Sequence, residues 1–277
     1  MGLLEFKRNK FSLDGEDGII ERIFSLVGTS TKTFCEFGAW DGIYLSNTRK
    51  LVEESWSGLY VEADSSRFKT LKKNCAAYPG VKCANRFFYS SSDLESALVE
   101  NGFESPLDFL SIDIDGMDYF ILADLTIRPR LICIEANWGH APESTLIVPA
   151  EVAVNGIGEP LLAFTRSAKV HGYQLIAYNH NAFFLREDLA HPLLPEIDPA
   201  TAYVESMGSL SLKDRRWMYI TNKGWVYPYY KFQNNYLTAK SLRLGPMDIL
   251  LAYAWACYLQ TRRLFKRIAI ALGLKKA

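Results

Sequence analysis

Carboxylates collect after two apolar stretches of the sequence, in a spacing that suits proton transfer or metal binding. Asp113 and Asp115 share one face of an extended segment because side chains alternate along a strand, and Asp118 follows them. The next apolar run ends in Glu135 and leads to His140. Oxygen ligands of this kind hold Mg²⁺ or Mn²⁺, and a buried carboxylate among others can also act as a general base because its pKa is raised. We expect Asp113 to act in the site, Asp118 to cap the following helix, and His140 to be a candidate acid or base.

A second group of carboxylates and glycines surrounds an earlier apolar run. Glu36 ends that run, Gly38 and Gly42 open the loop after it, and Asp41 lies between them. The spacing does not match the Gly-x-Gly-x-x-Gly pattern that cradles a dinucleotide pyrophosphate. Carboxylates suit instead the cationic amino-acid end of S-adenosylmethionine, and Glu62, at the end of the next apolar run, suits a ribose diol. The pattern therefore favours S-adenosylmethionine as the cofactor, with an NAD-linked oxidoreductase as a weaker alternative.

These residues need a sheet that brings the ends of several strands together. Between residues 15 and 186, short apolar runs alternate with segments of helical periodicity, which is typical of βαβ units around a parallel sheet. We expect strands at residues 33–37, 59–62, 81–84, 108–114, 130–135, 173–178 and 182–186. We expect helices at residues 15–26, 46–54, 66–78, 92–101 and 161–169. Ligands of such sheets bind at the carboxyl ends of the strands, where both groups of carboxylates fall.

Five short motifs occur in a fixed order across about residues 11–188. They are Phe11-Ser-Leu-Asp-Gly-Glu-Asp-Gly-Ile19, Glu36-Phe-Gly-Ala-Trp-Asp-Gly42, Trp56-Ser-Gly-Leu-Tyr-Val-Glu-Ala-Asp64, the run from Asp108 to Tyr119, and Asn181-Ala-Phe-Phe-Leu185. Together they resemble the FkbM-like branch of the class I S-adenosylmethionine-dependent methyltransferases. The resemblance implies a Rossmann-like α/β fold, in which a seven-stranded, mostly parallel sheet has an antiparallel last strand.

The resemblance also implies roles for individual residues. The cofactor would be bound by Glu36, Gly38, Ala39, Asp41, Gly42, Asn47, Glu62, Ala63 and Asp113. By likeness to metal-dependent sugar O-methyltransferases, Asp113 and Glu135 would ligate Mg²⁺ or Mn²⁺ and Asp115 would be the base. Ala136 departs from that pattern, because those enzymes carry a further carboxylate at this position.

The expected activity is methylation of a hydroxyl group on a saccharide or a glycosylated natural product. Asp115 would remove the proton, while Asp113 and Glu135 would orient the acceptor or hold a divalent ion. The alternative is a non-catalytic module that keeps the fold and binds the cofactor or a glycan. The sequence does not identify the acceptor.

Composition excludes several classes of protein. The 277 residues include 31 Lys+Arg and 31 Asp+Glu, so no overall positive field exists for non-specific nucleic-acid binding, and nucleic acid is not an expected partner. Five cysteines without a Cys-x-x-Cys pair indicate reduced thiols, and the first residues lack the apolar run of a secretory signal. We therefore expect a cytoplasmic protein.

The C-terminal third differs in character from the rest. We expect a methyltransferase domain at residues 1–190 and a C-terminal extension at 191–277, irregular over 191–203. Aromatic residues crowd residues 217–236 and form either a core or a sugar-stacking platform. From residue 246 an apolar run precedes a cluster of four cations, which permits peripheral membrane contact. A helix packed on the domain or on a second copy of the chain is the other interpretation.

Overall fold

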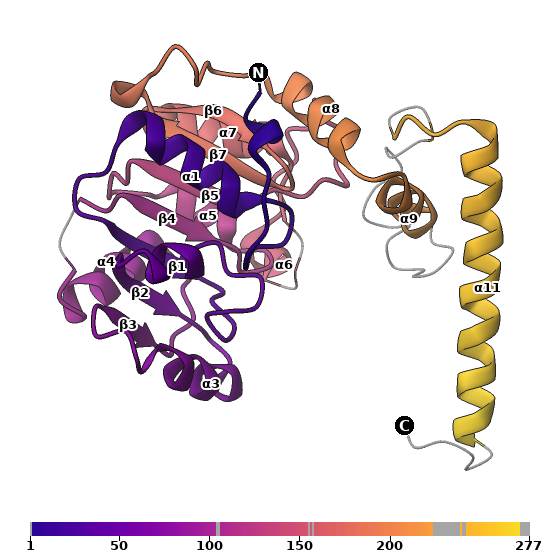
Figure 1. The fold of residues 1–277 in the computed structure, drawn as a ribbon, viewed down its shortest axis with the longest axis horizontal. Coiled ribbons are helices and arrows are strands. Elements are labelled where there is room, and N and C mark those ends of the chain that lie inside the picture. Colours follow the sequence, from indigo (N-terminus) through magenta and orange to yellow (C-terminus); the bar gives the residue numbers. More distant parts are fainter. Residues whose placement is uncertain are drawn as a thin grey trace. The chain divides into compact units, whose positions relative to one another are not determined.

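A computed structural model describes residues 2–103, 106–154, 156, 158–223, 239 and 242–271 (Figure 1). The chain divides into two compact units, each described by itself below. The first comprises residues 1–138 and 142–203, and the second comprises residues 139–141 and 204–277. The first unit therefore extends beyond residue 190, through the next loop and into the following helix.

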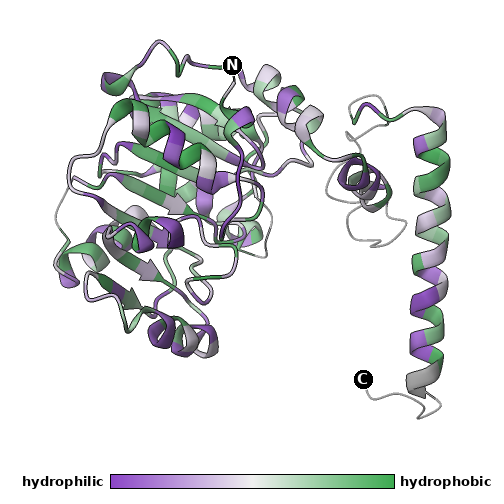
Figure 2. Cartoon of the chain, in the orientation of Figure 1, coloured by the Kyte–Doolittle hydropathy of each residue, from purple (hydrophilic) through white to green (hydrophobic). Residues whose placement is uncertain are grey.

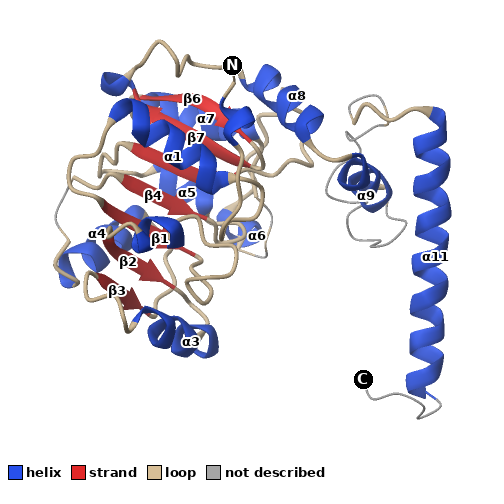
Figure 3. Ribbon diagram, viewed as in Figure 1, coloured by secondary structure: helices blue, strands red, loops and turns tan. Residues whose placement is uncertain are grey.

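A seven-stranded sheet forms the centre of the first unit (Figure 3). Its strands are β1 (Thr33–Phe37), β2 (Ser57–Val61), β3 (Val81–Ala84), β4 (Phe109–Ile112), β5 (Leu131–Glu135), β6 (Tyr173–Tyr178) and β7 (Asn181–Arg186). The spatial order is β3-β2-β1-β4-β5-β7-β6, and β7 is antiparallel to both of its neighbours while β1 to β5 are parallel. The predicted fold class, a Rossmann-like sheet with an antiparallel last strand, is confirmed.

Helices bury the sheet because its strands are apolar on both faces (Figure 2). The helices of this unit are α1 (Glu16–Val27), α2 (Arg49–Glu53), α3 (Ser65–Cys75), α4 (Ser91–Glu100), α5 (Asp118–Ala123), α6 (Ala150–Ala153) and α7 (Leu161–Val170), with short 3-10 turns η1 (Leu3–Phe6) and η2 (Glu187–Leu189). Apolar side chains of α1, α2 and α3 join one core with alternate residues of the strands, and α4 and α7 both pack against α5. This arrangement holds the carboxyl ends of β1 to β5 at one edge.

Several segments differ from the predictions. The strand predicted at 108–114 ends at Ile112, so Asp113 and Asp115 lie in the loop after it and not on one face of a strand, because Asp115 has a φ of +54°. The helix predicted at 46–54 begins only at Arg49, because the side chains of Ser46 and Thr48 donate hydrogen bonds to Glu36 and hold the preceding residues as a loop. The stretch 191–203, predicted to be irregular, contains the start of α8 (Pro199–Ser209). Proline suits the first helical position because that residue needs no intrahelical N–H bond.

The second unit contains two described helices, α9 (Leu212–Asn222) and α11 (Pro246–Ala271). They pack through two aromatic pairs: the rings of Trp217 and Trp255 are 5.4 Å apart, and those of Tyr219 and Tyr253 are 6.1 Å apart. The helical C-terminal extension is therefore present. Of the predicted aromatic-rich segment, Trp225, Tyr227, Tyr229, Tyr230, Phe232 and Tyr236 lie outside the described residues. Among the described helices, none combines the length and the apolar character needed to cross a bilayer.

Candidate functional site

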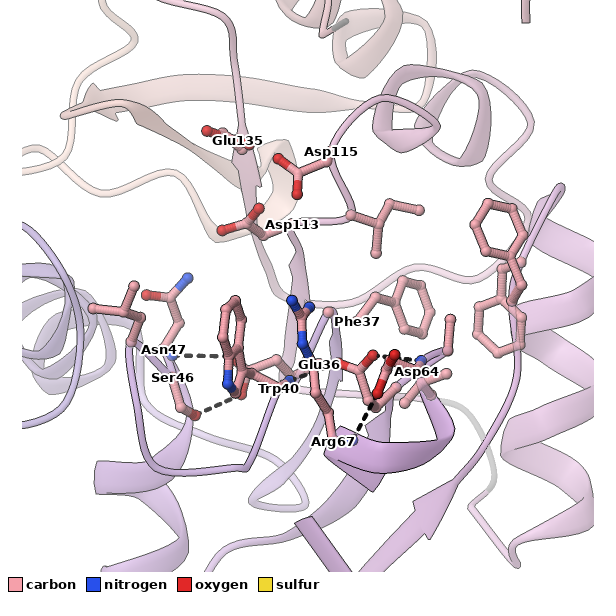
Figure 4. A pocket seen from close by; sticks show the side chains of 18 of the residues that line it. Glu36, Phe37, Trp40, Ser46, Asn47, Asp64, Arg67, Asp113, Asp115 and Glu135 are labelled. Carbon is pink, nitrogen blue, oxygen red and sulfur yellow. Dashed lines mark hydrogen bonds between the residues drawn. The ribbon is translucent and has the colours of Figure 1, made fainter. Parts of the chain in front are cut away.

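A pocket of about 440 Å³ lies where the first five strands end (Figure 4). Its lining residues are Glu36, Phe37, Gly38, Trp40, Tyr44, Leu45, Ser46, Asn47, Val61, Glu62, Ala63, Asp64, Arg67, Arg86, Phe87, Phe88, Asp113, Ile114, Asp115 and Glu135. A volume of this size accommodates a ligand of cofactor dimensions. The pocket thus contains both predicted groups of carboxylates.

The loops after β1 and β4 touch at the base of the pocket. Gly38 has a φ of +72°, and a Cβ atom there would lie 1.8 Å from the carbonyl oxygen of Asp113. Only glycine permits both the positive φ and the close approach of the two backbones. The contact fixes the loop after β1 against the loop that carries Asp113 and Asp115.

Glu36 is the buried anchor of the loop that leads to α2. Its carboxylate accepts hydrogen bonds from the Ser46 hydroxyl at 2.7 Å, from the Asn47 backbone N–H at 3.0 Å and from the Thr48 hydroxyl. Burial raises the pKa of Glu36 to about 7, although these donors oppose the rise. The buried Glu36 side chain therefore holds residues 46–48, which lead into α2, against the end of β1.

Glu62, at the end of β2, closes the neighbouring wall of the pocket. Its two carboxylate oxygens accept hydrogen bonds from the backbone N–H groups of Trp40 at 2.9 Å and Asp64 at 2.7 Å. Each oxygen keeps a further lone pair, so the side chain can still accept bonds from a ligand. The two N–H bonds fix the carboxylate in one orientation at the pocket edge.

Aromatic and cationic side chains that the sequence analysis did not select form the outer wall. The Arg67 guanidinium lies 3.6 Å from the centroid of the Trp40 ring, and Tyr44 meets that ring edge-on at 5.9 Å. Arg86 and Phe87 follow the end of β3 and also line the pocket. The rule that ligands bind at strand ends would have identified these last two residues.

Three carboxylates from β4 and β5 form the inner end of the pocket. Oxygen atoms of Asp113, Asp115 and Glu135 all lie within 4.8 Å of one another. Burial and the negative charge of Glu135 raise the pKa of Asp113 well above its ordinary value. Burial and the charges of Asp118 and Asp115 raise the pKa of Glu135 to about 7. Asp113 and Glu135 are hydrogen-bonded to each other, so ionisation of one opposes ionisation of the other.

Asp118 shapes the loop that carries this cluster. Its carboxylate accepts hydrogen bonds from the backbone N–H groups of Ile114 at 3.0 Å and Gly116 at 2.8 Å, and it begins α5. Burial raises its pKa. Asp115, between these two residues, has a φ of +54°, a conformation that the Asp118 bonds hold in place. Asp118 is therefore a structural residue, but the prediction that it caps the following helix is wrong: Met117 is the N-cap of α5, and the Asp118 carboxylate binds the loop before the helix.

The predicted cofactor residues divide into two groups. The structure brings Glu36, Gly38, Asn47, Glu62, Ala63 and Asp113 to the pocket lining. The Asp41 carboxylate accepts backbone bonds from Ile43 and Tyr44 and closes a turn of the loop. Ala39 lies in the apolar core and Gly42 faces Leu71, so these three residues shape the loop from behind the lining.

Two further polar residues follow the end of β5. Asn137 donates its side-chain amide to the carbonyl oxygen of Gly158 at 3.2 Å. His140 is buried and belongs to the second unit, and its role as an acid or base stays a prediction.

The donor set of the cluster fits a hard divalent cation. Mg²⁺ and Mn²⁺ prefer carboxylate oxygens, and three converge here. The missing carboxylate at position 136 does not weaken the ligand set, because position 136 faces away from it. Ala136 is fully buried, its N–H donates to the carbonyl oxygen of His180, and its carbonyl oxygen accepts from the Tyr178 hydroxyl. Asp115 contributes the third carboxylate instead.

No protein-family model and no curated protein sequence matches the chain. Solved structures similar to it include M. capricolum TrmK in complex with S-adenosyl-homocysteine, at 12% identity and a TM-score of 0.42 over 81% of this chain and 94% of that one. The N-terminal domain of EvdMO1 in the presence of SAH and D-fucose is 13% identical, with a TM-score of 0.42 over 66% and 90%. Precorrin-6y C5,15-methyltransferase from Geobacter metallireducens GS-15 is 14% identical, with a TM-score of 0.36 over 62% and 78%. Similarity at this level assigns neither an activity nor a ligand to this chain.

Proposed function

We propose that the chain is an S-adenosylmethionine-dependent O-methyltransferase. One observation carries the proposal: a single pocket joins the carboxylate at the end of β2 to the three carboxylates after β4 and β5. A cofactor with a ribose and a cationic end fits the first part, and an acceptor hydroxyl that must lose a proton fits the second.

The wall beside β1 supports S-adenosylmethionine over a dinucleotide. The Asn47 N–H is bonded to Glu36, so it does not point at a phosphate. The pKa values of Glu36 and Asp113 are raised, so a nearby ammonium or sulfonium group would favour their ionised forms, whereas a phosphate would oppose them. Glu62 is positioned for the ribose diol, and the Phe87 ring offers a flat apolar surface for the adenine.

Methyl transfer is an in-line displacement, so the protein mainly positions the acceptor and accepts its proton. The acceptor oxygen attacks the methyl carbon, the sulfur–carbon bond breaks with its electron pair going to sulfur, and the hydroxyl proton passes to the Asp115 carboxylate. The Asp113–Glu135 pair lies within reach to orient the acceptor.

A divalent ion is part of the proposal. Asp113 and Glu135 would hold Mg²⁺ or Mn²⁺, and the neighbouring Asp115 would remain the base. When bound, the ion would lower the pKa of the acceptor hydroxyl. The FkbM-like resemblance supports a saccharide or glycosylated natural product as the acceptor.

The first experiment is calorimetric titration with S-adenosylhomocysteine and, separately, with NAD. We expect micromolar binding of S-adenosylhomocysteine and none of NAD. Glu62→Ala should weaken binding by about tenfold, since it removes charged hydrogen bonds to the ribose. Glu54→Gln, at the exposed end of α2, removes the same charge away from the pocket and should bind normally. Absence of S-adenosylhomocysteine binding by the folded wild-type chain would overturn the proposal.

A second experiment separates an enzyme from a binding module of the same fold. Saccharide acceptors are incubated with S-adenosylmethionine carrying a labelled methyl group, with and without Mg²⁺. Label transfer supports the enzyme. Cofactor binding with no label transfer to any saccharide class supports the binding module.

A further inference from the structure

The long helix α11 carries an apolar stripe along its exposed side. Seven of its described large apolar side chains are exposed, among them Met247 at 65%, Leu250 at 61% and Phe265 at 66%. The stripe, which we call the α11 stripe, comprises Met247, Leu250, Leu251, Ala254, Cys257, Tyr258, Thr261, Leu264, Phe265 and Ile268. These positions recur every three or four residues, so they lie on one side of the helix, and none of them is charged.

The opposite side of α11 already has a partner. Ala252 and Ala256 are fully buried, and Trp255 and Tyr253 pack against aromatic rings of α9. Because α9 covers that side, it leaves the α11 stripe exposed. An exposed apolar surface of several turns marks an interaction site.

The charges around the stripe all have one sign. On the same helix Arg262 and Arg267 flank the stripe and Lys266 lies next to Arg262, whereas Arg263 is on the opposite side. The sequence from residue 249 to the end of the chain contains no acidic residue. The one acid of α11, Asp248, is paired with Arg216 at 2.6 Å. The surface that complements this helix is therefore apolar in its centre and anionic at its margins.

We propose that the α11 stripe docks on an anionic lipid bilayer. An interfacial helix buries its apolar face at the boundary between headgroups and acyl chains, and its Lys and Arg side chains meet the lipid phosphates. With 26 residues and about 1.5 Å of rise per residue, α11 is about 39 Å long and lies in the plane of the surface.

A second copy of the chain fits the stripe less well. Two α11 helices packed side by side in parallel would bring eight cations together, because each copy contributes the same four. In the antiparallel arrangement, the cationic half of one helix would face a segment whose one acid is bound to Arg216. Three of every seven residues are in the stripe, which is also wider than the two-position seam of a coiled coil.

The test is flotation of the full-length chain with vesicles of phosphatidylcholine alone or mixed with phosphatidylglycerol. We expect binding to the mixed vesicles only, weakened by added salt. The triple variant R262Q/K266Q/R267Q should bind about a hundredfold more weakly, since each cation contributes about fivefold. The matched control K69Q/K72Q/K73Q removes three exposed cations from α3 and should bind like the wild type.

The apolar part of the stripe is tested separately with L264S/F265S/I268S. This variant should lose vesicle binding, while V99S/V170S/L193S, which changes three exposed apolar residues of the first unit, should keep it. Circular dichroism and melting temperature establish that each variant folds. Equal binding to both vesicle types, or no binding by the wild type, would overturn the proposal. So would an equilibrium sedimentation result in which the wild type is a dimer and L264S/F265S/I268S is a monomer. None of these outcomes depends on methyl transfer.

Discussion

Carboxylates lie near both the amino ends and the carboxyl ends of strands β4 and β5, but the groups that surround them differ. At the amino ends, the buried Asp108 carboxylate accepts hydrogen bonds from the backbone N–H groups of Ser30, Thr31 and Lys32 and lies 3.4 Å from the Arg130 guanidinium. At the carboxyl ends, Asp113 and Glu135 face each other and a third carboxylate, and among the described residues no Lys or Arg forms an ion pair with them.

The difference is between a carboxylate whose negative charge is paired and carboxylates that lie against one another. Asp108 has all the positive partners that a buried charge needs, so it ties the loop before β1 to the sheet. Asp113 and Glu135 are held together by the fold despite mutual repulsion, which raises their pKa values. Such an arrangement opposes stability and is typical of a site that binds a proton, a cation or a substrate.

Loss of the proposed base should give the largest effect. Asp115→Asn should lower the rate of methyl transfer by about a hundred- to ten-thousandfold, because no carboxylate remains at position 115 to take the proton of the substrate hydroxyl. Calorimetry should find S-adenosylhomocysteine binding unchanged. Turnover near the wild-type rate would place the base elsewhere in the cluster.

A substitution at the amino ends of β4 and β5 should reduce stability and leave activity unchanged. Asp108→Asn should lower the free energy of unfolding by about 3 kcal/mol, since Arg130 and the three N–H groups lose their buried anion. Urea denaturation measures this loss. The activity per folded molecule should stay unchanged, and a selective loss of activity would contradict the structural role.

The dependence of kcat on pH should reflect the ionisation of the carboxylate cluster. The pKa of Glu135 is about 7, so the rate should rise with pH through that region and fall about tenfold per unit below it, if the ionised pair is the active form. The measurement is kcat against pH for the wild type and Glu135→Gln. Glu135→Gln should lack the rise in rate near pH 7. A profile identical to that of the wild type would show that Glu135 does not cause the rise.

The smallest expected effect is a gain in stability. A carboxyl group whose pKa is raised in the folded state binds more protons folded than unfolded, so it lowers stability as the pH rises from its ordinary value toward 7. Glu135→Gln should therefore raise the free energy of unfolding by about 1 kcal/mol above pH 7 and have little effect in acid. Denaturation at the two pH values checks the sign; destabilisation at high pH would show that the cluster is not strained.

The sheet and its carboxyl edge followed from the sequence because their signals are local. Apolar runs bounded by turns mark β1 to β7, and parallel topology then requires that Asp113 and Glu135 meet. The shortened α2 was not predictable, because Ser46 and Thr48 leave the helix to bind Glu36, a residue of another element.

Other features of the site depend on contacts between distant residues. Asp41 and Glu62 are both acidic residues at or just after the end of an apolar run, yet Asp41 closes a turn and Glu62 lines the pocket. The stacking of Arg67 on Trp40 joins the β1 loop to α3, and no spacing rule specifies such a pair. Side-chain direction, set by packing, decides which of the predicted residues reach the pocket.

The contact at Gly38 has a consequence for protein engineering. Since a Cβ there would lie 1.8 Å from the Asp113 carbonyl oxygen, the loop after β1 and the loop after β4 are interlocked parts. A chimaera that imports either loop alone from another protein would bring a mismatched surface to this crossing and distort the other loop. Recombination that changes the acceptor range must exchange the two segments together or leave both intact.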